Sequence, residues 1–85
     1  EVVKALRAVG ALVHDTSRVG GGFPDLVVKY RGVVRLLEVK DGRRPPSARQ
    51  MTPQEAAWHS LWGGPEALVR VVNDAEDALR AIGAL

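Results

Sequence analysis

Two runs of aliphatic and β-branched residues, Leu26–Tyr30 and Val33–Val39, are separated only by Arg31-Gly32. Runs of this kind, joined by a two-residue turn that contains glycine, are typical of a β-hairpin. Apolar side chains occur on both faces of these strands, which favours a sheet that helices cover on both sides. Because 85 residues suffice for one hydrophobic core, we expect a single domain spanning residues 1–85.

The rest of the chain alternates apolar segments with glycine, proline and capping residues, which mark the ends of helices and strands. The predicted segments are a helix over Glu1–Val9 that stops at Gly10, a strand Ala11–Val13, a loop Thr16–Gly22, the hairpin, a loop without regular structure over Asp41–Gln50, a helix from Thr52 to about Trp62, a strand Ala67–Val72, and a last helix that follows Asn73-Asp74 and stops at Gly83. Their order, α-β-β-β-α-β-α, predicts an α/β fold with a central mixed sheet flanked by helices.

Composition excludes several kinds of site. The chain has no cysteine, so a disulfide framework and a thiolate metal site are excluded, and any metal ion must use oxygen or histidine ligands. No apolar run approaches the length of a membrane span and no signal-peptide pattern is present, so we expect a cytoplasmic protein without a membrane segment. The formal net charge of +2 is a weak indication of nucleic acid.

The predicted hairpin brings two carboxylates together. A turn centred on Arg31-Gly32 pairs residues whose numbers have a constant sum, so Asp25 faces Glu38. A four-residue loop with the same centre keeps this pairing, whereas a three- or five-residue loop shifts it by one position. Like charges on directly opposite residues repel each other, so this pair indicates a cation site.

Lys40 joins the two carboxylates, because alternate side chains of a strand share a face and Glu38 and Lys40 are two residues apart. Mg²⁺ binds through one or two carboxylates, water and substrate phosphate, and the backbone carbonyl of Val39 offers another oxygen. A metal ion at this place can activate water and stabilise the charge that develops on a phosphodiester. Lys40 can then orient the nucleophile, contact the scissile phosphate or, with a lowered pKa, act as the base. In the structural alternative, Asp25 is a turn residue after Pro24, and Glu38 and Lys40 are an ordinary exposed pair.

Basic and glycine residues near this site are candidates for contacts with a DNA backbone. The candidates are Arg18, Gly21, Gly22, Arg43, Arg44 and Arg49. Gly20–Gly22 could equally well make the turn into the hairpin, and the arginine cluster could be a solvated loop.

The histidines and tryptophans favour structural roles. His14 and His59 lie on different elements, and neither begins a metal-ligand motif. Trp58 and Trp62 are one helical turn apart, which favours packing over base stacking.

At these residues the chain resembles the PD-(D/E)XK nuclease superfamily and, within it, the VRR-NUC family of small phage and bacterial nuclease domains. The matching stretches are Val19–Val28, Leu37–Gly42, Met51–Glu55, Trp58-His59 and Glu76–Leu79. The resemblance implies a restriction-endonuclease-like core and a nuclease that cuts DNA with Mg²⁺ or Mn²⁺ in a bacterial or phage-infected cell. Stand-alone phage members are similar to Holliday-junction resolvases and act as homodimers.

The resemblance also assigns residues. Family metal ligands fall on Asp25, Glu38 and the Val39 carbonyl, and the catalytic lysine falls on Lys40. All of these positions agree with the hairpin register.

Two supporting positions depart from the family pattern. The family often has a glutamine in the helix after the lysine, and the matching position here is Glu55, with Gln54 one place earlier. The acidic residue of the family's first helix falls on Glu1, or near it.

These observations predict a metal-dependent, structure-selective DNA endonuclease acting on branched DNA in the manner of a Holliday-junction resolvase. The alternative is a non-catalytic DNA-binding module that retains the nuclease fold. A structural or interaction domain without nucleic acid would leave the carboxylate pair unexplained.

Overall fold

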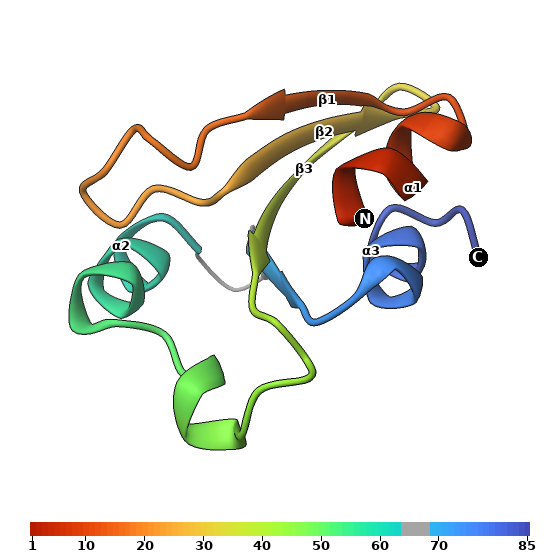
Figure 1. The fold of residues 1–85 in the computed structure, drawn as a ribbon. Coiled ribbons are helices and arrows are strands. Elements are labelled where there is room, and N and C mark those ends of the chain that lie inside the picture. Colours follow the sequence, from red (N-terminus) through yellow and green to blue (C-terminus); the bar gives the residue numbers. More distant parts are fainter. Residues whose placement is uncertain (64–68) are drawn as a thin grey trace.

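The structure is a computed structural model that describes residues 1–63 and 69–85. Its elements are α1 (Val2–Ala8), β1 (Leu12–Asp15), β2 (Leu26–Tyr30), β3 (Val33–Val39), the 3₁₀ helix η1 (Pro46–Arg49), α2 (Pro53–Gly63), β4 (Val69–Val72) and α3 (Ala75–Ala81). The strands form one sheet in the order β1-β2-β3-β4 (Figure 1). The pairs β1–β2 and β2–β3 are antiparallel and β3–β4 is parallel, which confirms the predicted mixed sheet and element order.

The β2–β3 hairpin has the predicted ends and register. Tyr30 pairs with Val33, as a two-residue turn requires. Arg31 and Gly32 both have positive φ angles, 51° and 81°, which is the geometry of a type I′ turn. The guanidinium of Arg31 lies 5.0 Å from the centre of the Tyr30 ring, a cation–π contact at the tip of the hairpin.

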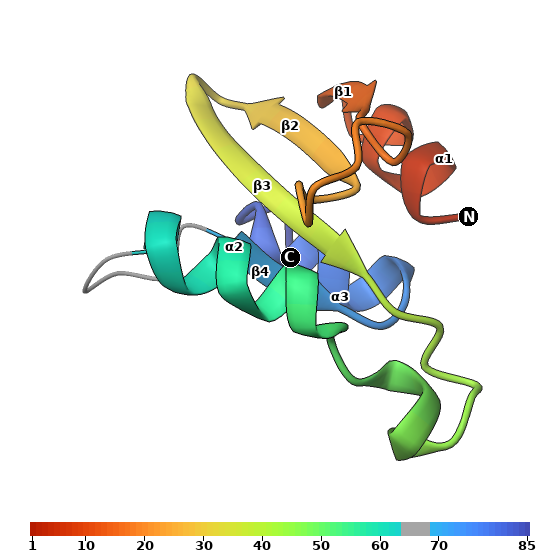
Figure 2. The ribbon, with the colours of Figure 1, turned by 90° about the vertical axis from the view of Figure 1, so that its left-hand side faces the viewer.

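Helices cover both faces of the sheet. α1 and α3 pack together on one face, and α2 lies on the other face, beside the ends of β3 and β4 (Figures 1 and 2). The hydrophobic core lies between the sheet, α1 and α3, and its buried residues include Leu6, Leu26, Val28, Leu37, Val72, Ala78 and Ile82. Because α2 adds no fully buried residue, its position depends on the contacts around the site described below.

The end of α1 explains why β1 starts later than the predicted Ala11–Val13. The N–H groups of Gly10 and Ala11 donate to the carbonyls of Arg7 and Leu6, over 3.0 and 3.1 Å. With Gly10 at φ 88°, this is a Schellman motif. Because the N–H of Ala11 is bonded to the end of the helix, the strand begins at the next residue.

The prediction of no regular structure over Asp41–Gln50 is wrong at η1. Pro45 precedes this short helix in an extended conformation, with ψ 154°, and Pro46 lies in its first turn. Proline is well suited to that position, because its ring holds φ at a helical value and the first N–H of a helix has no partner within it. The prolines therefore start the helix.

The remaining helices match their capping signals. Asp74 accepts a 2.8 Å hydrogen bond from the N–H of Asp77 at the start of α3, and α2 follows Thr52 as predicted. Ala67 and Leu68, the first residues of the predicted fourth strand, lie outside the described residues. Neither the helices of residues 1–63 nor that of residues 69–85 have the length and apolarity to cross a membrane.

Candidate active site

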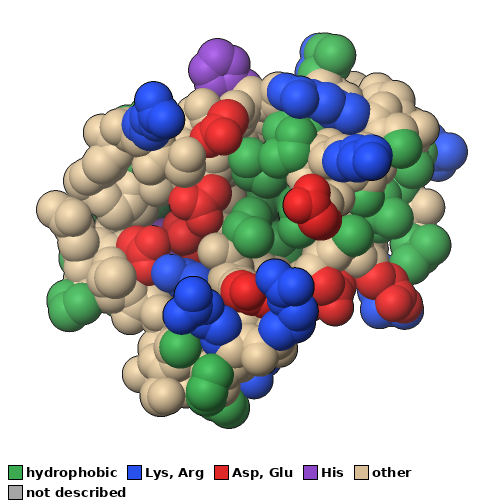
Figure 3. Space-filling view, in the orientation of Figure 1, with side chains coloured by type: hydrophobic (Ala, Val, Ile, Leu, Met, Phe, Trp, Pro, Cys, Tyr) green, Lys and Arg blue, Asp and Glu red, His purple; other side chains and the backbone are tan. Residues whose placement is uncertain are grey.

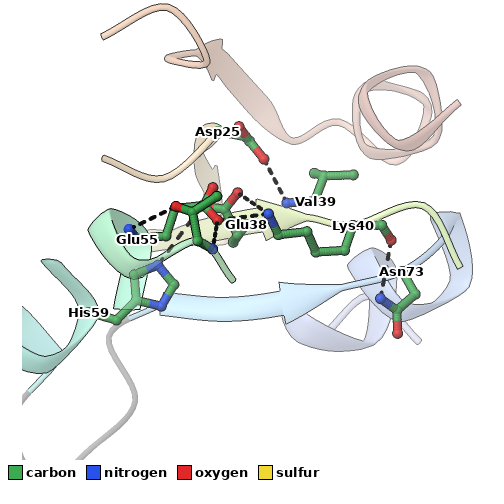
Figure 4. Close-up of polar contacts among 8 residues, drawn as sticks. Asp25, Glu38, Val39, Lys40, Glu55, His59 and Asn73 are labelled. Atoms are coloured by element: carbon green, nitrogen blue, oxygen red, sulfur yellow. Dashed lines mark hydrogen bonds and ion pairs between the residues drawn. The ribbon is translucent and has the colours of Figure 1, made fainter. Parts of the chain in front are cut away.

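Asp25 lies one step beyond the last pair of the β2–β3 ladder, Leu26 with Leu37. Continuing the register by one residue places it opposite Glu38, as predicted. Its Oδ2 atom accepts a 2.9 Å hydrogen bond from the N–H of Val39 (Figure 4). The carboxylate is therefore tied to the strand that carries the other site residues.

Buried Thr16 holds the backbone at Asp25. Its N–H donates to the Asp25 carbonyl over 2.8 Å, and its hydroxyl donates to the carbonyl of buried Pro24 over 2.7 Å. These two bonds connect the end of β1 to the start of β2. The sequence pattern indicated Thr16 only as the first residue of a loop.

The side chain of Glu38 is buried, with 1% of its surface exposed. Burial, together with the nearby carboxylates of Asp25 and Glu55, raises its pKa to about 9. Within the described part of the chain, its Oε1 atom has no hydrogen-bond partner. A buried carboxylate among other carboxylates is costly unless a cation compensates it.

Lys40 supplies part of that compensation. Its Nζ lies 2.8 Å from Glu55 Oε1 and 3.8 Å from Glu38 Oε2 (Figure 4). Burial lowers the pKa of Lys40, but the hydrogen bond and charge of Glu55 outweigh burial and raise it above its usual value. The ammonium group therefore stays charged at neutral pH. Its backbone is anchored to β4 through a 2.9 Å bond from its N–H to the Val72 carbonyl and a 3.1 Å bond from the Asn73 amide to its carbonyl.

Glu55 occupies the helix position that contacts Lys40. Its Oε1 also accepts a 2.8 Å hydrogen bond from the N–H of Thr52, and the Thr52 hydroxyl accepts from the Glu55 N–H over 3.2 Å. This reciprocal pair is a capping box. Burial raises the pKa of Glu55, but the bonds from Lys40 and Thr52 prevail and lower it to about 2. The Gln54 side chain is exposed.

The loop before β2 docks α2 over the site. Gly22 has φ 84°, and a Cβ there would collide with the Gln54 carbonyl and lie 3.1 Å from the Cβ of Trp58. The Phe23 and Trp58 rings pack edge to face, with centroids 5.2 Å apart. Gly22 is thus required for close packing of the loop on the helix, and contact of Gly21 or Gly22 with DNA stays a prediction.

His59 lies at the site, although its sequence context suggested only packing or a surface role. Its Nε2 is 3.9 Å from Glu38 Oε1, and its side chain is 14% exposed. The signal that could have found it is spacing, because Glu55 and His59 are four residues apart and share one face of a helix.

A cavity of about 490 Å³ opens beside Asp25 on the α1 side of the sheet. Glu1, Val39 and Asp41 are among the residues that line it. Glu1 and Asp25 therefore line the same cavity, whereas Glu38 is not among its lining residues. Whether Glu1 binds a metal ion stays a prediction.

Three of the four predicted DNA-binding arginines, Arg18, Arg43 and Arg44, lie on loops. Arg18 and Arg44 are exposed, Arg43 forms a 3.1 Å ion pair with Asp41, and half-buried Arg49 belongs to η1. Figure 3 shows acidic side chains spread over the middle of one face of the molecule, with Lys and Arg side chains beside them. The arrangement suits a phosphate backbone passing over an acidic site, and the individual contacts stay predictions.

Hard oxygen donors are available for a cation. In residues 1–63 and 69–85, no three His, Cys, Asp or Glu side chains are arranged to hold a metal ion by themselves. The predicted set of the Asp25 and Glu38 carboxylates with the Val39 carbonyl does not require a third, because Mg²⁺ retains waters and commonly uses one or two carboxylates. The unpartnered Oε1 of Glu38 adds a free acceptor. The donor set therefore fits Mg²⁺ or Mn²⁺.

A mixed sheet in which one hairpin brings two carboxylates and a lysine together beneath a helix defines an α/β domain with a candidate cation site. No family model and no curated protein matches the sequence. A solved structure described as a VRR_NUC domain matches with a TM-score of 0.66 and 31% sequence identity, over 95% of this chain and 85% of that chain. The chain therefore belongs to the VRR-NUC family.

Proposed function

We propose that this domain is a divalent-metal-dependent endonuclease that hydrolyses phosphodiester bonds in DNA. The observation that carries the proposal is the buried carboxylate of Glu38, which burial and neighbouring carboxylates give a pKa of about 9, beside a charged Lys40. A buried carboxylate of this kind destabilises the folded protein unless a cation is bound. Groups with strongly shifted pKa values also cluster at functional sites. Membership of the VRR-NUC family supports the same conclusion.

Asp25, Glu38 and the Val39 carbonyl are the groups that would hold the ion. When bound, Mg²⁺ or Mn²⁺ supplies Lewis acidity and lowers the pKa of water. The N–H of Val39 orients Asp25, so both carboxylates are placed by the same short piece of β3.

Lys40 acts as a charged donor in this proposal. Of the three roles open to it, base catalysis is disfavoured because its pKa is raised. An ammonium group near the carboxylates can donate to a scissile phosphate oxygen or to the nucleophile and stabilise the negative charge of the transition state. Glu55 holds it in place through the 2.8 Å contact.

The surrounding loops would position the substrate. Arg18, Arg43, Arg44 and Arg49 are proposed to contact phosphates, which gives affinity and register without sequence selectivity. Because such contacts follow backbone shape, we propose branched DNA, including four-way junctions, as the preferred substrate. A homodimer would place two sites on two strands, which one small domain cannot cut symmetrically.

The second candidate is a DNA-binding module without turnover. The observation that favours it is the short Lys40–Glu55 pair, which engages the lysine within the protein itself. An activity assay separates the two functions.

The test is incubation of the protein with labelled four-way junction, flap and linear duplex DNA in Mg²⁺, Mn²⁺ or EDTA. We expect cleavage only with metal, and losses of ~10²–10³-fold in Asp25→Asn and Lys40→Ala, on the scale of removing one transition-state contact. Lys29→Ala, at an exposed lysine of β2, is the matched control and should cleave normally.

Cleavage that survives EDTA, or that Asp25→Asn leaves unchanged, would contradict the mechanism. Binding without cleavage under every metal condition would establish the second candidate. Sedimentation at assay concentration tests the homodimer, and a monomer that still resolves junctions symmetrically would exclude it.

A further inference from the structure

Two buried polar atoms face each other at the base of the site. Glu38 Oε1 and His59 Nε2 are 3.9 Å apart, and their side chains are 1% and 14% exposed. Neither atom has a hydrogen-bond partner in the described part of the chain. Buried polar atoms in native proteins are nearly always hydrogen-bonded, so a pair of them left facing each other requires an explanation.

The gap is too long for a hydrogen bond, which needs about 2.7–3.2 Å between an N–H donor and its oxygen acceptor. It is also too short for another group to lie between the two atoms on the direct line. A small movement of either side chain would close it. The two atoms are chemically matched, because an imidazole N–H donates and a carboxylate oxygen accepts.

The two oxygens of Glu38 have different neighbours. Lys40, the residue after β3, approaches Oε2 at 3.8 Å, and His59 approaches Oε1 from α2. Figure 4 shows His59 pointing from the helix toward Glu38. The carboxylate is therefore held between the end of β3 and α2.

Packing fixes His59 in this position. The Trp58 and His59 rings lie edge to face with centroids 6.1 Å apart, and Trp58 in turn packs against Phe23. Glu55, one turn earlier on the same helix face, is bonded to Lys40. The helix thus brings Glu55 to Lys40 and His59 to Glu38, at the end of β3.

We propose that His59 is a positioning residue whose Nε2–H donates a hydrogen bond to Glu38 Oε1 and fixes this carboxylate for binding a divalent cation. The inference rests on the proposed function, since it assigns His59 a part in the same site. Hydrogen bonds to ligating carboxylates orient them, and their removal typically weakens metal binding by about 10–100-fold.

The test compares Mn²⁺ dissociation constants, measured from the EPR signal of free Mn²⁺, for wild type, His59→Gln, His59→Asn and His59→Leu. Glutamine carries an amide N–H close to the position of Nε2, asparagine reaches only as far as Nδ1, and leucine keeps the apolar volume. We expect His59→Gln to bind within about threefold of wild type and the other two to bind about 10–100-fold more weakly. His14→Leu, at the exposed histidine of β1, is the matched control and should bind as wild type does.

A second measurement requires no metal. Long-range ¹H–¹⁵N spectra of the metal-free protein should show the His59 proton on Nε2, with a resonance that moves on addition of Mg²⁺ in wild type but not in Glu38→Gln. A proton on Nδ1 instead would overturn the proposal, and this holds even if a substituted variant fails to fold.

The outcomes separate the inference from the function on which it rests. Wild-type protein that binds Mn²⁺ while His59→Asn and His59→Leu bind equally well would overturn the role of His59 alone. Wild-type protein that binds no Mn²⁺ would overturn both.

Discussion

One oxygen of Glu55 joins the start of α2 to Lys40. Its Oε1 lies 2.8 Å from the Lys40 ammonium and accepts the N–H of Thr52, also over 2.8 Å. The capping of the helix and the placement of the lysine are thereby coupled. A change that loosens the cap should also release Lys40.

Substitutions at Glu55 separate its charge from its hydrogen bonds. Glu55→Gln keeps the capping box, because glutamine also serves at this position, but it loses the charge of a carboxyl whose pKa is lowered to about 2. We therefore expect a loss of ~1–2 kcal/mol and cleavage reduced no more than about tenfold. Glu55→Ala loses both contacts and should cost about 1 kcal/mol more, on the scale of a lost helix cap, with a larger loss of cleavage. Thermal unfolding and initial cleavage rates measure the two effects. Wild-type cleavage by Glu55→Ala would show that the contact does not position Lys40.

Glu38→Gln should stabilise the metal-free protein while abolishing cleavage. The folded-state pKa of Glu38 is raised from about 4.5 to about 9 by burial and by the carboxylates of Asp25 and Glu55. The contribution of Glu38 to the free energy of unfolding is therefore fully present below pH 4.5, where the carboxyl is protonated in both states. It is lost as the pH rises toward 9, because the unfolded chain ionises more readily than the folded protein. At pH 7, which is about 2.5 units above 4.5, the substitution should add on the order of 3–4 kcal/mol, since each unit corresponds to about 1.4 kcal/mol.

Urea unfolding in EDTA at pH 5, 7 and 9 measures this effect, and the advantage of Glu38→Gln should grow with pH. Glu55 does not contribute to this pH dependence. Its pKa is lowered to about 2, so the stability that its ionised form provides is lost only as the pH falls below 4.5. Glu76→Gln, at an exposed glutamate of α3, controls for a general loss of negative charge. An advantage that is the same at all three pH values would contradict the buried, uncompensated state of Glu38.

Gly22→Ala tests the docking of α2. Both Gly21 and Gly22 have positive φ, 68° and 84°, but only Gly22 has atoms of α2 within contact distance of an added Cβ. Each alanine should cost ~1–2 kcal/mol for the backbone conformation, and Gly22→Ala a further ~1–3 kcal/mol for overpacking. Chemical denaturation measures both variants. Equal losses would mean that the loop and helix do not pack as closely as the structure shows.

Thr16→Val removes the hydroxyl that donates to the Pro24 carbonyl while keeping the size of the side chain. We expect a loss of about 1–3 kcal/mol, because a buried carbonyl is left unpaired, and slower cleavage because the backbone of Asp25 is less well fixed. Ser17→Ala, at an exposed residue whose hydroxyl donates to Asp15, should have little effect on either quantity. Unchanged cleavage by a folded Thr16→Val protein would contradict the link between Thr16 and Asp25.

The sequence by itself determined the features that depend on neighbouring residues. A two-residue turn at Arg31-Gly32 sets the register of the hairpin, and side-chain alternation then puts Asp25 opposite Glu38 with Lys40 on the face of Glu38. The capping box of Thr52 and Glu55 was predictable for the same reason, because both of its hydrogen bonds are local. The 3₁₀ helix at Pro46–Arg49 was missed because prolines that forbid a helix interior also favour a helix start.

Only the tertiary structure decided how α2 sits on the sheet. Its position depends on the contact of Gly22 and Phe23 with Trp58, which is far from them in sequence, and none of these residues carries much signal individually. That docking buries Glu38, pairs Glu55 with Lys40 and brings His59 to the carboxylate. The raised pKa of Glu38 follows from the same packing, because desolvation and the approach of Glu55 arise only when helix and strand come together.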